Sequence, residues 1–375
     1  MRCDLLIAGA GPAGCAAAVA ALRAAPHLEV VVVDRAVFPR EKLCAGAICG
    51  GGLRELELAG LLLRVPHALA THAVVRHRGR AARVPLRRPA AVVRRIEFDA
   101  DLVAQARAAG ARVLEGTALL GLEGGFAATS SGPVACRALV AADGVGGPSR
   151  RLLGLPAGAR APLRETLLGA AQRDLLFDLE AGWPGYAWRF PCLEEGRAAQ
   201  TGGVYAYARG ADADRALRRF LHREEREGGS PGRWAIRLFE PRGPYGKGQA
   251  LLAGDALGID PLAGEGLRYA LWSGRIAGRR AAEALARGRS PSVGGYRAEL
   301  LRSRSGVVLV LATHLAKRLY GPDERYRRLA TDRRVAEGLA DLVSGEAPLG
   351  PLLRLLALAP GALLGLRPPS DAPGG

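Results

Sequence analysis

The chain of 375 residues is long enough to bury one large core or two modest ones, and its 49% of hydrophobic residues indicate a globular protein. Its formal net charge of +17 comes almost wholly from arginine, which is spread along the chain, and aromatic residues make up only 5%. Because nucleic-acid binders gather basic residues on one face and single-strand binders add stacking rings, this pattern argues against nucleic acid as a partner. Attraction to an anionic lipid surface or an acidic substrate stays open.

Cysteine usage and apolar runs bear on the compartment. The six cysteines form no C-x-x-C pair and no metal-ligand spacing, so we expect a reducing, cytoplasmic compartment, mostly buried thiols and no metal. The N-terminus enters a strand directly, without the regions of a signal peptide. No apolar stretch reaches the roughly 18 residues that a membrane span needs. The nearest, Pro348–Leu366, is expected to pack as a helix pair or to rest on a membrane surface.

A strand, a glycine turn and a helix open the chain. The apolar strand covers residues 4–8 and the helix covers residues 15–25. A second strand, residues 29–33, ends in Asp34. The turn at residues 9–14 reads G-x-G-x-x-G, which between a strand and a helix is the Rossmann dinucleotide fingerprint.

Each glycine of this fingerprint has its own role. Gly9 allows the tight turn, Gly11 lets the backbone approach a pyrophosphate, and Gly14 lets helix and strand pack closely. The helix N-terminus offers free N–H groups and a positive dipole to the phosphates. Asp34 is placed to hold a ribose 2′-hydroxyl. The sequence therefore predicts a dinucleotide site at its start.

Two hairpins and a helix follow in chain order. The first hairpin turns at Gly79 within residues 73–86, and a helix is expected over residues 98–109. A second hairpin, residues 126–137, leads into an apolar strand that stops at Asp143-Gly144.

The pattern then changes to short strands and turns, and later changes back. Residues 155–248 contain several short strands with one helix over 212–227. A strand that ends at Gly254-Asp255 resembles the earlier strands of the nucleotide domain, and a long helix over 265–287 follows it. The remaining residues, 290–375, are expected to be mostly helical. The nucleotide domain is therefore predicted to be split in sequence.

Three signatures in this order resemble the FAD-dependent oxidoreductases of the para-hydroxybenzoate hydroxylase superfamily. They are the N-terminal glycine fingerprint, Asp143-Gly144 after a strand, and Gly254-Asp255, which in that superfamily contacts the ribityl chain. The run Arg95–Leu102 is similar to its Arg-x-x-Phe-Asp-x-x-Leu helix start, whose arginine lies near the FAD.

Further motifs resemble the geranylgeranyl reductase family within that superfamily. Phe38–Ile48 is similar to its Phe-Pro-Arg-x-Lys-x-Cys-Gly-Gly loop, with Ala45 where glycine is usual. Tyr186–Pro191 matches a Tyr-x-Trp-x-Phe-Pro signature associated with the substrate cavity, although Cys192 replaces the lysine that often follows. Pro261–Leu271 resembles its Pro-Leu-x-Gly-Glu-Gly stretch.

The resemblance implies an α/β fold: a Rossmann-like FAD-binding domain with an inserted β-rich substrate domain and a helical C-terminal region. The four parts are residues 1–155 (first FAD part, with a hairpin near 70–90), 156–248 (substrate domain), 249–290 (second FAD part) and 291–375 (helical region).

It also implies a chemistry: hydride transfer from reduced FAD to a carbon–carbon double bond of an isoprenoid, with NAD(P)H or another reductant as electron donor. Such a substrate is an apolar small molecule, so peripheral contact with an anionic membrane is expected. Tyr186, Trp188 and Phe190 share one strand face and are expected to line an apolar substrate tunnel, with ordinary sheet core as the alternative. Cys44 is expected beside the flavin as a catalytic proton donor or redox partner, with an inert small residue as the alternative.

The resemblance places the cofactor on a defined set of residues. Asp255 can accept from a ribityl hydroxyl, and the helix that opens at Gly264-Glu265-Gly266 would point its N–H groups at the flavin N1 and O2 edge, where reduced flavin carries negative charge. The cofactor-binding residues are expected to be Gly9, Gly11, Pro12, Ala13, Gly14, Asp34, Arg35, Arg40, Lys42, Ala45, Arg95, Asp143, Gly144, Gly254, Asp255, Pro261, Gly264, Glu265 and Gly266.

Two other enzyme classes share the nucleotide signatures. One is an FAD-dependent monooxygenase that hydroxylates an aromatic compound, and the other is a lycopene cyclase-like enzyme that binds FAD without redox chemistry. A halogenase would be expected to carry Trp-x-Trp-x-Ile-Pro, which Tyr186–Pro191 does not match. Only the substrate region separates these classes.

Overall fold

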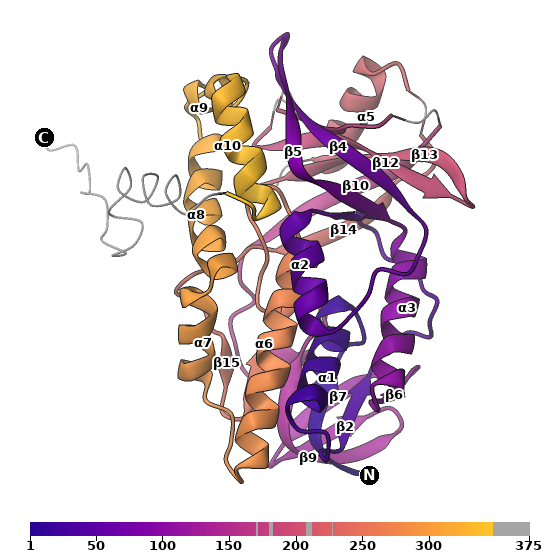
Figure 1. The fold of residues 1–375 in the computed structure, drawn as a ribbon, viewed down its shortest axis with the longest axis vertical. Helices are drawn as coiled ribbons and strands as arrows, with labels where there is room; N and C mark the ends of the chain where they lie inside the picture. Colours follow the sequence, from indigo (N-terminus) through magenta and orange to yellow (C-terminus); the bar gives the residue numbers. More distant parts are fainter. Residues whose placement is uncertain (170–171, 180–182, 208–211, 227, 348–375) are drawn as a thin grey trace, which may run out of the picture.

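The opening strand–helix–strand unit builds the first of two large sheets (Figure 1). The computed structural model describes residues 1–169, 172–179, 183–207, 212–226 and 228–347. The first sheet has the strand order β15-β16-β9-β1-β2-β6, with β7 and β8 paired beyond β9. Its strands are β1 (Arg2–Ala8), β2 (Val30–Val33), β6 (Arg112–Leu114), β7 (Leu119–Glu123), β8 (Phe126–Thr129), β9 (Gly132–Ala141), β15 (Gly246–Lys247) and β16 (Ala250–Leu252).

The centre of this sheet is parallel and buried on both faces. Leu6 on β1 pairs with Val31 on β2 and with Leu139 on β9. Because side chains alternate along a strand, Leu5 and Ile7 face the helices while Leu6 faces the β7–β8–β9 side. A strand buried on both faces reads as a continuous apolar run, which is why residues 4–8 and 29–33 were recognisable in the sequence.

Helices α1 (Pro12–Ala24), α3 (Arg95–Ala108) and α6 (Leu267–Ala286) pack on one side of this sheet. Helices α1 and α6 lie unusually close together. A Cβ atom added at Gly274 would lie 2.1 Å from the carbonyl oxygen of Ala13, and one added at Gly278 would lie 2.0 Å from that of Ala17. Small residues on both helices therefore join the two sequence-distant parts of the FAD-binding domain.

The second sheet has the order β14-β10-β13-β12-β11-β4-β5-β3 and lies above the first in Figure 1. Its strands are β3 (Ala47–Ile48), β4 (His67–His77), β5 (Arg80–Val93), β10 (Arg160–Leu168), β11 (Leu175–Asp178), β12 (Gly185–Glu194), β13 (Arg197–Ala206) and β14 (Gly232–Arg237). The hairpin β4–β5, predicted to belong to the first FAD part, joins this sheet through the parallel pairing of β4 with β11. Three strands of the second sheet thus come from before the β-rich segment 156–248.

The two faces of the second sheet have different neighbours. Helix α5 (Ala213–Arg223) packs on one face, where Ala187 meets Phe220 in a small apolar cluster. Tyr186, Trp188 and Phe190 alternate with Ala187 and therefore point to the opposite face, toward the FAD-binding domain.

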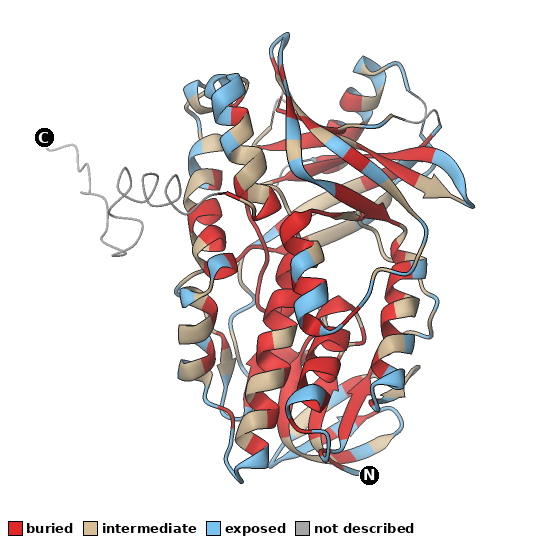
Figure 2. Ribbon diagram, in the orientation of Figure 1, coloured by how far each residue is buried: buried red, intermediate tan, exposed pale blue. Residues whose placement is uncertain are grey.

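Helices α7 (Val293–Arg302), α8 (Arg304–Leu319), α9 (Arg325–Leu329) and α10 (Arg333–Ser344) cover one long side of the molecule, where buried segments face inward and exposed ones outward (Figures 1 and 2). The other helices lie elsewhere: α2 (Gly50–Ala59) packs against α6, the short α4 (Ser149–Leu152) contacts β7, and η1 (Gly254–Ala256) contacts α6 and β14. The sequence prediction of a helical C-terminal region therefore fits as far as residue 347. The expected helix pair at Pro348–Leu366 lies outside the described residues. Across the described part of the chain, every helix is too short or too polar to cross a bilayer.

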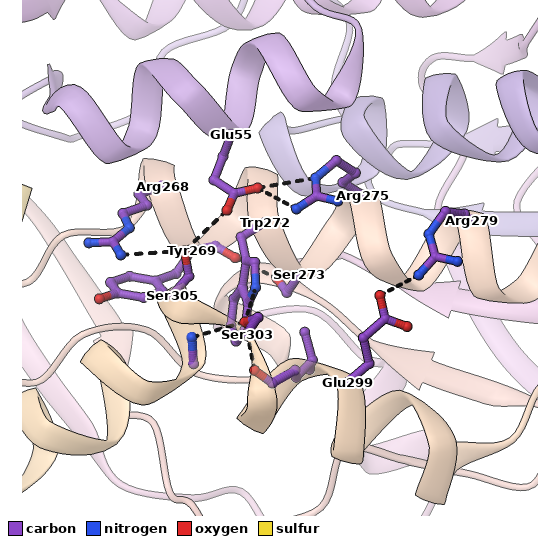
Figure 3. A network of polar contacts seen from close by, with 12 residues as sticks. Glu55, Arg268, Tyr269, Trp272, Ser273, Arg275, Arg279, Glu299, Ser303 and Ser305 are labelled. Carbon is purple, nitrogen blue, oxygen red and sulfur yellow. Dashed lines mark hydrogen bonds and ion pairs between the residues drawn. The ribbon is translucent and has the colours of Figure 1, made fainter. Parts of the chain in front are cut away.

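A buried polar network holds α6 against α2 and α8 (Figure 3). Glu55 on α2 accepts from Arg275 at 2.7 Å and from the hydroxyl of Ser305 at 3.1 Å. Arg268 donates to the same hydroxyl at 3.3 Å, and Trp272 donates to Ser303 at 2.9 Å. These bonds fix the first turns of α6, which begins at the end of the nucleotide loop.

Candidate active site

A cavity of about 380 Å³ lies between the two sheets, at the carboxyl ends of β1 and β16. Ligands in open α/β sheets bind at this end of the strands. Every predicted site residue lines it except Gly14 and Pro261. Those that do are Gly9, Gly11, Pro12, Ala13, Asp34, Arg35, Arg40, Lys42, Cys44, Ala45, Arg95, Asp143, Gly144, Tyr186, Trp188, Phe190, Gly254, Asp255, Gly264, Glu265 and Gly266.

The glycine turn has the geometry that each glycine was expected to supply. Gly9 has φ +102°, and a Cβ there would lie 2.4 Å from the carbonyl oxygen of Ala142. A Cβ at Gly14 would lie 1.8 Å from the carbonyl oxygen of Gly9, so Gly14 serves packing and stays outside the cavity. At Gly11 the nearest described atom to such a Cβ is Nη2 of Arg40 at 3.7 Å. Gly11 is therefore the glycine whose missing side chain leaves space for a ligand.

Asp34 is held by the backbone around the turn. Its carboxylate accepts from the N–H of Ala10 at 2.8 Å and from the N–H of Ala36 at 2.9 Å. Each carboxylate oxygen has further acceptor capacity, so the group can also hold a hydroxyl. Its predicted contact with ribose stays a prediction.

Two arginines converge on one buried carboxylate next to the turn. Asp99 on α3 forms a two-pronged ion pair with Arg95, at 2.6 and 2.7 Å, and a second with Arg40 at 3.1 Å. The nearby Cys44 side chain also favours the charged form of the Arg95 guanidinium and so contributes to its raised pKa. Nη1 of Arg40 is buried and lacks a partner among the described residues. This cluster therefore supplies a free donor to the cavity and a cation to the Cys44 sulfur.

Lys42 lies between Arg40 and Cys44 in the chain and lines the same cavity. Its ammonium lies 3.6 Å from the centre of the Trp234 ring, a cation–π contact. Burial lowers the pKa of Lys42 to about 8, although the Asp255 carboxylate works in the opposite direction. Lys42 is thus a cation inside the cavity whose pKa is lowered by burial.

Asp143 and Gly144 close the cavity beside the glycine turn. One oxygen of Asp143 accepts from the N–H of Ser149 at 2.8 Å, and the other is buried without a partner in the described part of the chain. Burial raises the pKa of Asp143 above its usual range. Gly144 has φ +77°, and no described atom lies within 4 Å of the position of a Cβ. A free acceptor and an open backbone edge therefore face the cavity.

Three tyrosines hold the loop that precedes α6. Tyr205 donates to the carbonyl of Pro261 at 2.7 Å, Tyr320 donates to that of Leu262, and Tyr186 donates to that of Ala263. From inside the loop, the Asp260 carboxylate accepts from the N–H of Leu262 at 2.8 Å and of Ala263 at 3.0 Å. Both ends of each peptide are thus satisfied, and the loop is ordered before any ligand arrives.

The roles of Tyr205, Tyr320 and Asp260 were missed in the sequence. The tyrosines come from β13 and α8, far from the loop in the chain, so no local motif marks them. Pro261, predicted to bind cofactor, instead contributes the carbonyl that Tyr205 holds.

Glu265 lies directly before α6 and faces the cavity. Both its carboxylate oxygens are buried without a hydrogen-bond partner among the described residues, and its nearest cation, Arg268, is 3.8 Å away. Burial raises the pKa of Glu265 to about 8, and the neighbouring Asp260 adds to the shift. Gly264 has φ +64°, which turns the chain into the helix. The helix N-terminus and an uncompensated acid therefore meet at this end of the site.

The aromatic residues Tyr186, Trp188 and Phe190 of β12 form one wall of the cavity, and their contact with a substrate stays a prediction. Tyr186 and Trp188 ring centroids are 6.1 Å apart, and those of Trp188 and Phe190 are 6.5 Å apart. Phe177 on β11 extends the wall, 5.5 Å from Tyr186 and 5.1 Å from Phe190. Tyr186 has two functions, because its ring lines the cavity while its hydroxyl holds the loop.

Cys44 is a half-buried thiol in the loop between the glycine turn and the aromatic wall. Its sulfur accepts from the N–H of Gly46 at 3.4 Å and is not part of a disulfide within the described ranges. Cys49, also a free thiol, lines the same cavity, and burial raises its pKa. Nowhere in the described residues do three or more His, Cys, Asp or Glu side chains gather as metal ligands would.

A second, smaller cavity of about 80 Å³ adjoins the first. The two share Cys49, Leu175, Phe177, Tyr186, Ala263 and Val343. Beyond these it is lined almost entirely by apolar side chains, mostly of β4, β5, α8 and α10, and Ala330 and Ala340 are among its lining residues.

The polar end of the first cavity fits FAD. It combines a dinucleotide turn, an open position at Gly11, a free donor on Arg40, a free acceptor on Asp143 and a helix N-terminus. Arg40 and the turn would face the pyrophosphate, and Asp255 the ribityl chain. The N–H groups after Gly264 would face the pyrimidine edge of the flavin ring.

Comparison with known proteins agrees with this fit. Residues 2–178 match the FAD binding domain family. A menaquinone reductase from Mycolicibacterium smegmatis is 32% identical over 318 residues, 74% of this chain and 75% of that protein. A digeranylgeranylglycerophospholipid reductase from Methanothrix thermoacetophila is 27% identical, with 84% and 86% covered.

A solved structure shares the fold over nearly the whole chain. It is a geranylgeranyl bacteriochlorophyll reductase-like protein from Thermoplasma acidophilum, with a TM-score of 0.76, 21% identity, and 97% of this chain and 98% of that one covered. The fingerprint turn, the cavity that it lines and the similarity to these reductases agree: the chain belongs to the geranylgeranyl reductase family of FAD-dependent oxidoreductases.

Proposed function

We propose that this enzyme reduces a carbon–carbon double bond in the prenyl chain of a lipid, such as a prenylated quinone. The observation that carries the proposal is the pair of joined cavities. The first fits FAD at its polar end and is walled by aromatic rings, and the second continues from it as an apolar extension. A polar or small aromatic substrate would leave that apolar extension empty, whereas a prenyl chain would fill it. The names of the two relatives, both reductases and both named for prenyl lipids, support the same substrate class.

The bound cofactor would supply the hydride, and the protein residues would do the rest. Trp188, Phe190 and Phe177 would hold the chain and exclude water, which strengthens every electrostatic interaction in the site. The N–H groups at the start of α6 would stabilise the negative charge of the reduced cofactor. Glu265 adjoins this end, and its neutral acid form avoids opposing that charge.

Cys44 would supply the proton for the second carbon of the double bond. The thiol lines the cavity together with Arg95, whose positive charge would stabilise the thiolate left behind. NAD(P)H is the reductant that we expect to reload the flavin.

The α9–α10 end of the molecule is the surface that we expect to meet the bilayer. Leu329 is 52% exposed and Val335 is 38% exposed, and exposed arginines surround them, including Arg328 and Arg334. Ala330, next to Leu329, is buried and lines the second cavity. A prenyl chain in an anionic membrane would therefore lie close to the end of its own cavity, and salt-sensitive binding to anionic vesicles is expected.

A variant that fills the second cavity tests the substrate proposal. Ala340 lies on α10 and lines that cavity, so Ala340→Phe should block long prenyl chains while short-chain analogues are still reduced. Gly338→Phe is the matched control, because a Cβ at Gly338 meets no described atom within 4 Å. The kcat/KM ratio of long to short substrates should fall at least about 10-fold in Ala340→Phe alone, the scale of 1.4 kcal/mol in binding. An unchanged ratio would remove the second cavity from the substrate site. Fast oxygen consumption stimulated by an aromatic compound would instead favour a hydroxylase.

A further inference from the structure

Glu165 is a buried acid inside the flavin cavity to which the chemistry described so far gives no role. It lies on β10 between Gly203 of β13 and Gly232 of β14, its cross-strand neighbours. It is 7% exposed and lines the cavity together with Leu163, two residues away on the same strand face. The next residue, Arg164, points to the other face and pairs with Asp214 of α5 at 2.8 Å.

The two glycines beside Glu165 explain how it is covered. A Cβ at Gly203 would lie 2.3 Å from the Trp188 ring, and one at Gly232 would lie 2.4 Å from the Leu43 side chain. The ring and the leucine can therefore close over the strand on either side of the carboxyl group. One carboxyl oxygen, Oε2, is buried and lacks a hydrogen-bond partner in the described part of the chain.

The surroundings of Glu165 link it to the reactive loop. Glu165 and Cys44 line the same cavity, and the backbone N–H of Cys44 favours the ionised form of the carboxyl group, which lowers its pKa. Arg94 and Arg95 at the start of α3 and Lys42 of the loop favour its ionised form, but burial outweighs them and raises the pKa of Glu165 to about 7. Two further groups face this region from β12: the Cys192 thiol, and Glu194, which pairs with Arg94 at 2.9 Å.

We propose that Glu165 is the proton store of this cavity and returns a proton to the Cys44 sulfur after each turnover. The inference rests on the proposed double-bond reduction. In that reaction the bound cofactor would supply a hydride to one alkene carbon, and the S–H bond of Cys44 would break as a C–H bond forms on the other carbon. The thiolate is then stabilised by Arg95, so it needs a nearby acid to regain its proton. The O–H bond of Glu165 breaks as the S–H bond re-forms, and solvent later reprotonates the carboxylate.

The kinetic test separates the first turnover from later ones. The first turnover of enzyme whose flavin has been reduced in advance uses the proton already on Cys44, so Glu165→Gln should leave its rate nearly unchanged. Steady-state reduction should fall by about 10²-fold, the lower end of the range for a lost general acid. Flavin reduction by NAD(P)H, measured separately, should keep its rate. Glu165→Asp, which keeps the acid, should recover part of the lost rate.

The pH profile gives the sign of the effect. The donating form of Glu165 is the neutral acid, which is lost as pH rises through about 7, so wild-type steady-state turnover should fall over that interval. The Glu165→Gln variant should lack this fall in turnover. The Glu194→Gln variant should retain it, because Glu194 pairs with Arg94 but does not line the cavity. Loss of this fall in Lys42→Met instead would transfer the role to the lysine and overturn the proposal.

A second readout does not depend on substrate reduction. The alkylation rate of Cys44 in the FAD-bound protein, followed by peptide mass spectrometry, should show a step near pH 7 that disappears in Glu165→Gln. If wild-type enzyme reduces no prenyl double bond, the proposed function fails while this titration still tests Glu165. An identical alkylation profile in Glu165→Gln, or equal slowing of first and later turnovers, would show that Glu165 only shapes the cavity.

Discussion

Replacing Gly11 should separate FAD binding from folding. Gly11 has φ −75° and ψ −174°, an extended conformation that any residue adopts, and a Cβ there meets no described atom nearer than 3.7 Å. Gly11→Val should therefore change the free energy of unfolding of the apoprotein by no more than about 1 kcal/mol, the scale for a glycine replaced at a compatible backbone position.

The same side chain would occupy the space that the pyrophosphate needs. Displacing the phosphates from two backbone N–H groups costs about 1.5–3 kcal/mol for each hydrogen bond to a charged group, or about 3–6 kcal/mol together. FAD affinity should then fall by about 10²–10⁴-fold, and the protein should purify colourless. Gly11→Ala should show a smaller loss.

Gly14→Ala is the matched control. Its Cβ would lie 1.8 Å from the carbonyl oxygen of Gly9, so it should lower the melting temperature of the apoprotein, which Gly11→Val should not. The measurements are FAD titration by fluorescence and thermal unfolding without cofactor. A yellow Gly11→Val protein with wild-type FAD affinity would refute the assignment of the turn to the pyrophosphate.

Four further predictions follow from the site. Asp255→Ala should weaken FAD by about 1.5–3 kcal/mol, as for a lost hydrogen bond to a charged acceptor, and an unchanged dissociation constant would remove Asp255 from the site. Cys44→Ser should retain FAD and flavin reduction, while double-bond reduction slows about 10²-fold or more, and Cys136→Ser serves as the control thiol variant. A wild-type rate of double-bond reduction in Cys44→Ser would mean that Cys44 is a packing residue. Trp188→Ala should impair turnover of long prenyl substrates and leave FAD binding nearly intact, whereas Phe220→Ala, on the other face of the sheet, should affect stability alone. If Trp188→Ala lost FAD as strongly as it lost turnover, Trp188 would support the flavin and not the substrate. Burial raises the pKa of Glu265 to about 8, so the folded protein keeps a proton that the unfolded chain has lost, and the stability of the apoprotein should fall as pH rises from about 4.5 to 8. The Glu265→Gln variant should be more stable than wild type at pH 8 and similar to it at pH 4. Equal melting temperatures of the two proteins at both pH values would contradict this prediction.

The parts of the fold with strong local patterns could be predicted from the sequence. The apolar runs of β1 and β2, the glycine turn and the small-residue helix α1 each follow from neighbouring residues, and so does the alternation that places Tyr186, Trp188 and Phe190 on one face. The return of the nucleotide pattern at Gly254-Asp255 also indicated a split domain.

Long-range pairing could not be predicted in this way. The hairpin β4–β5 was visible, but its parallel partner β11 is far along the chain, and periodicity does not specify which sheet a hairpin joins. The roles of Tyr205 and Tyr320 could not be predicted for the same reason, because the loop that their hydroxyls hold is far from both residues in the sequence. Glu165 reads as a polar position in a half-exposed strand, because the Trp188 and Leu43 side chains that close over its strand lie far from it in the sequence.

Isotope labelling during double-bond reduction tests the central claim most directly. FAD-loaded enzyme would be incubated anaerobically with a reductant and a menaquinone that carries an unsaturated prenyl chain, and the product analysed by mass spectrometry. The chain should gain two hydrogens. Labelled NAD(P)H, through the reduced flavin, should place deuterium at one of them, and deuterated solvent should place it at the other. A product with added oxygen, or recovery of the chain unchanged while the flavin is oxidised by other means, would contradict the account.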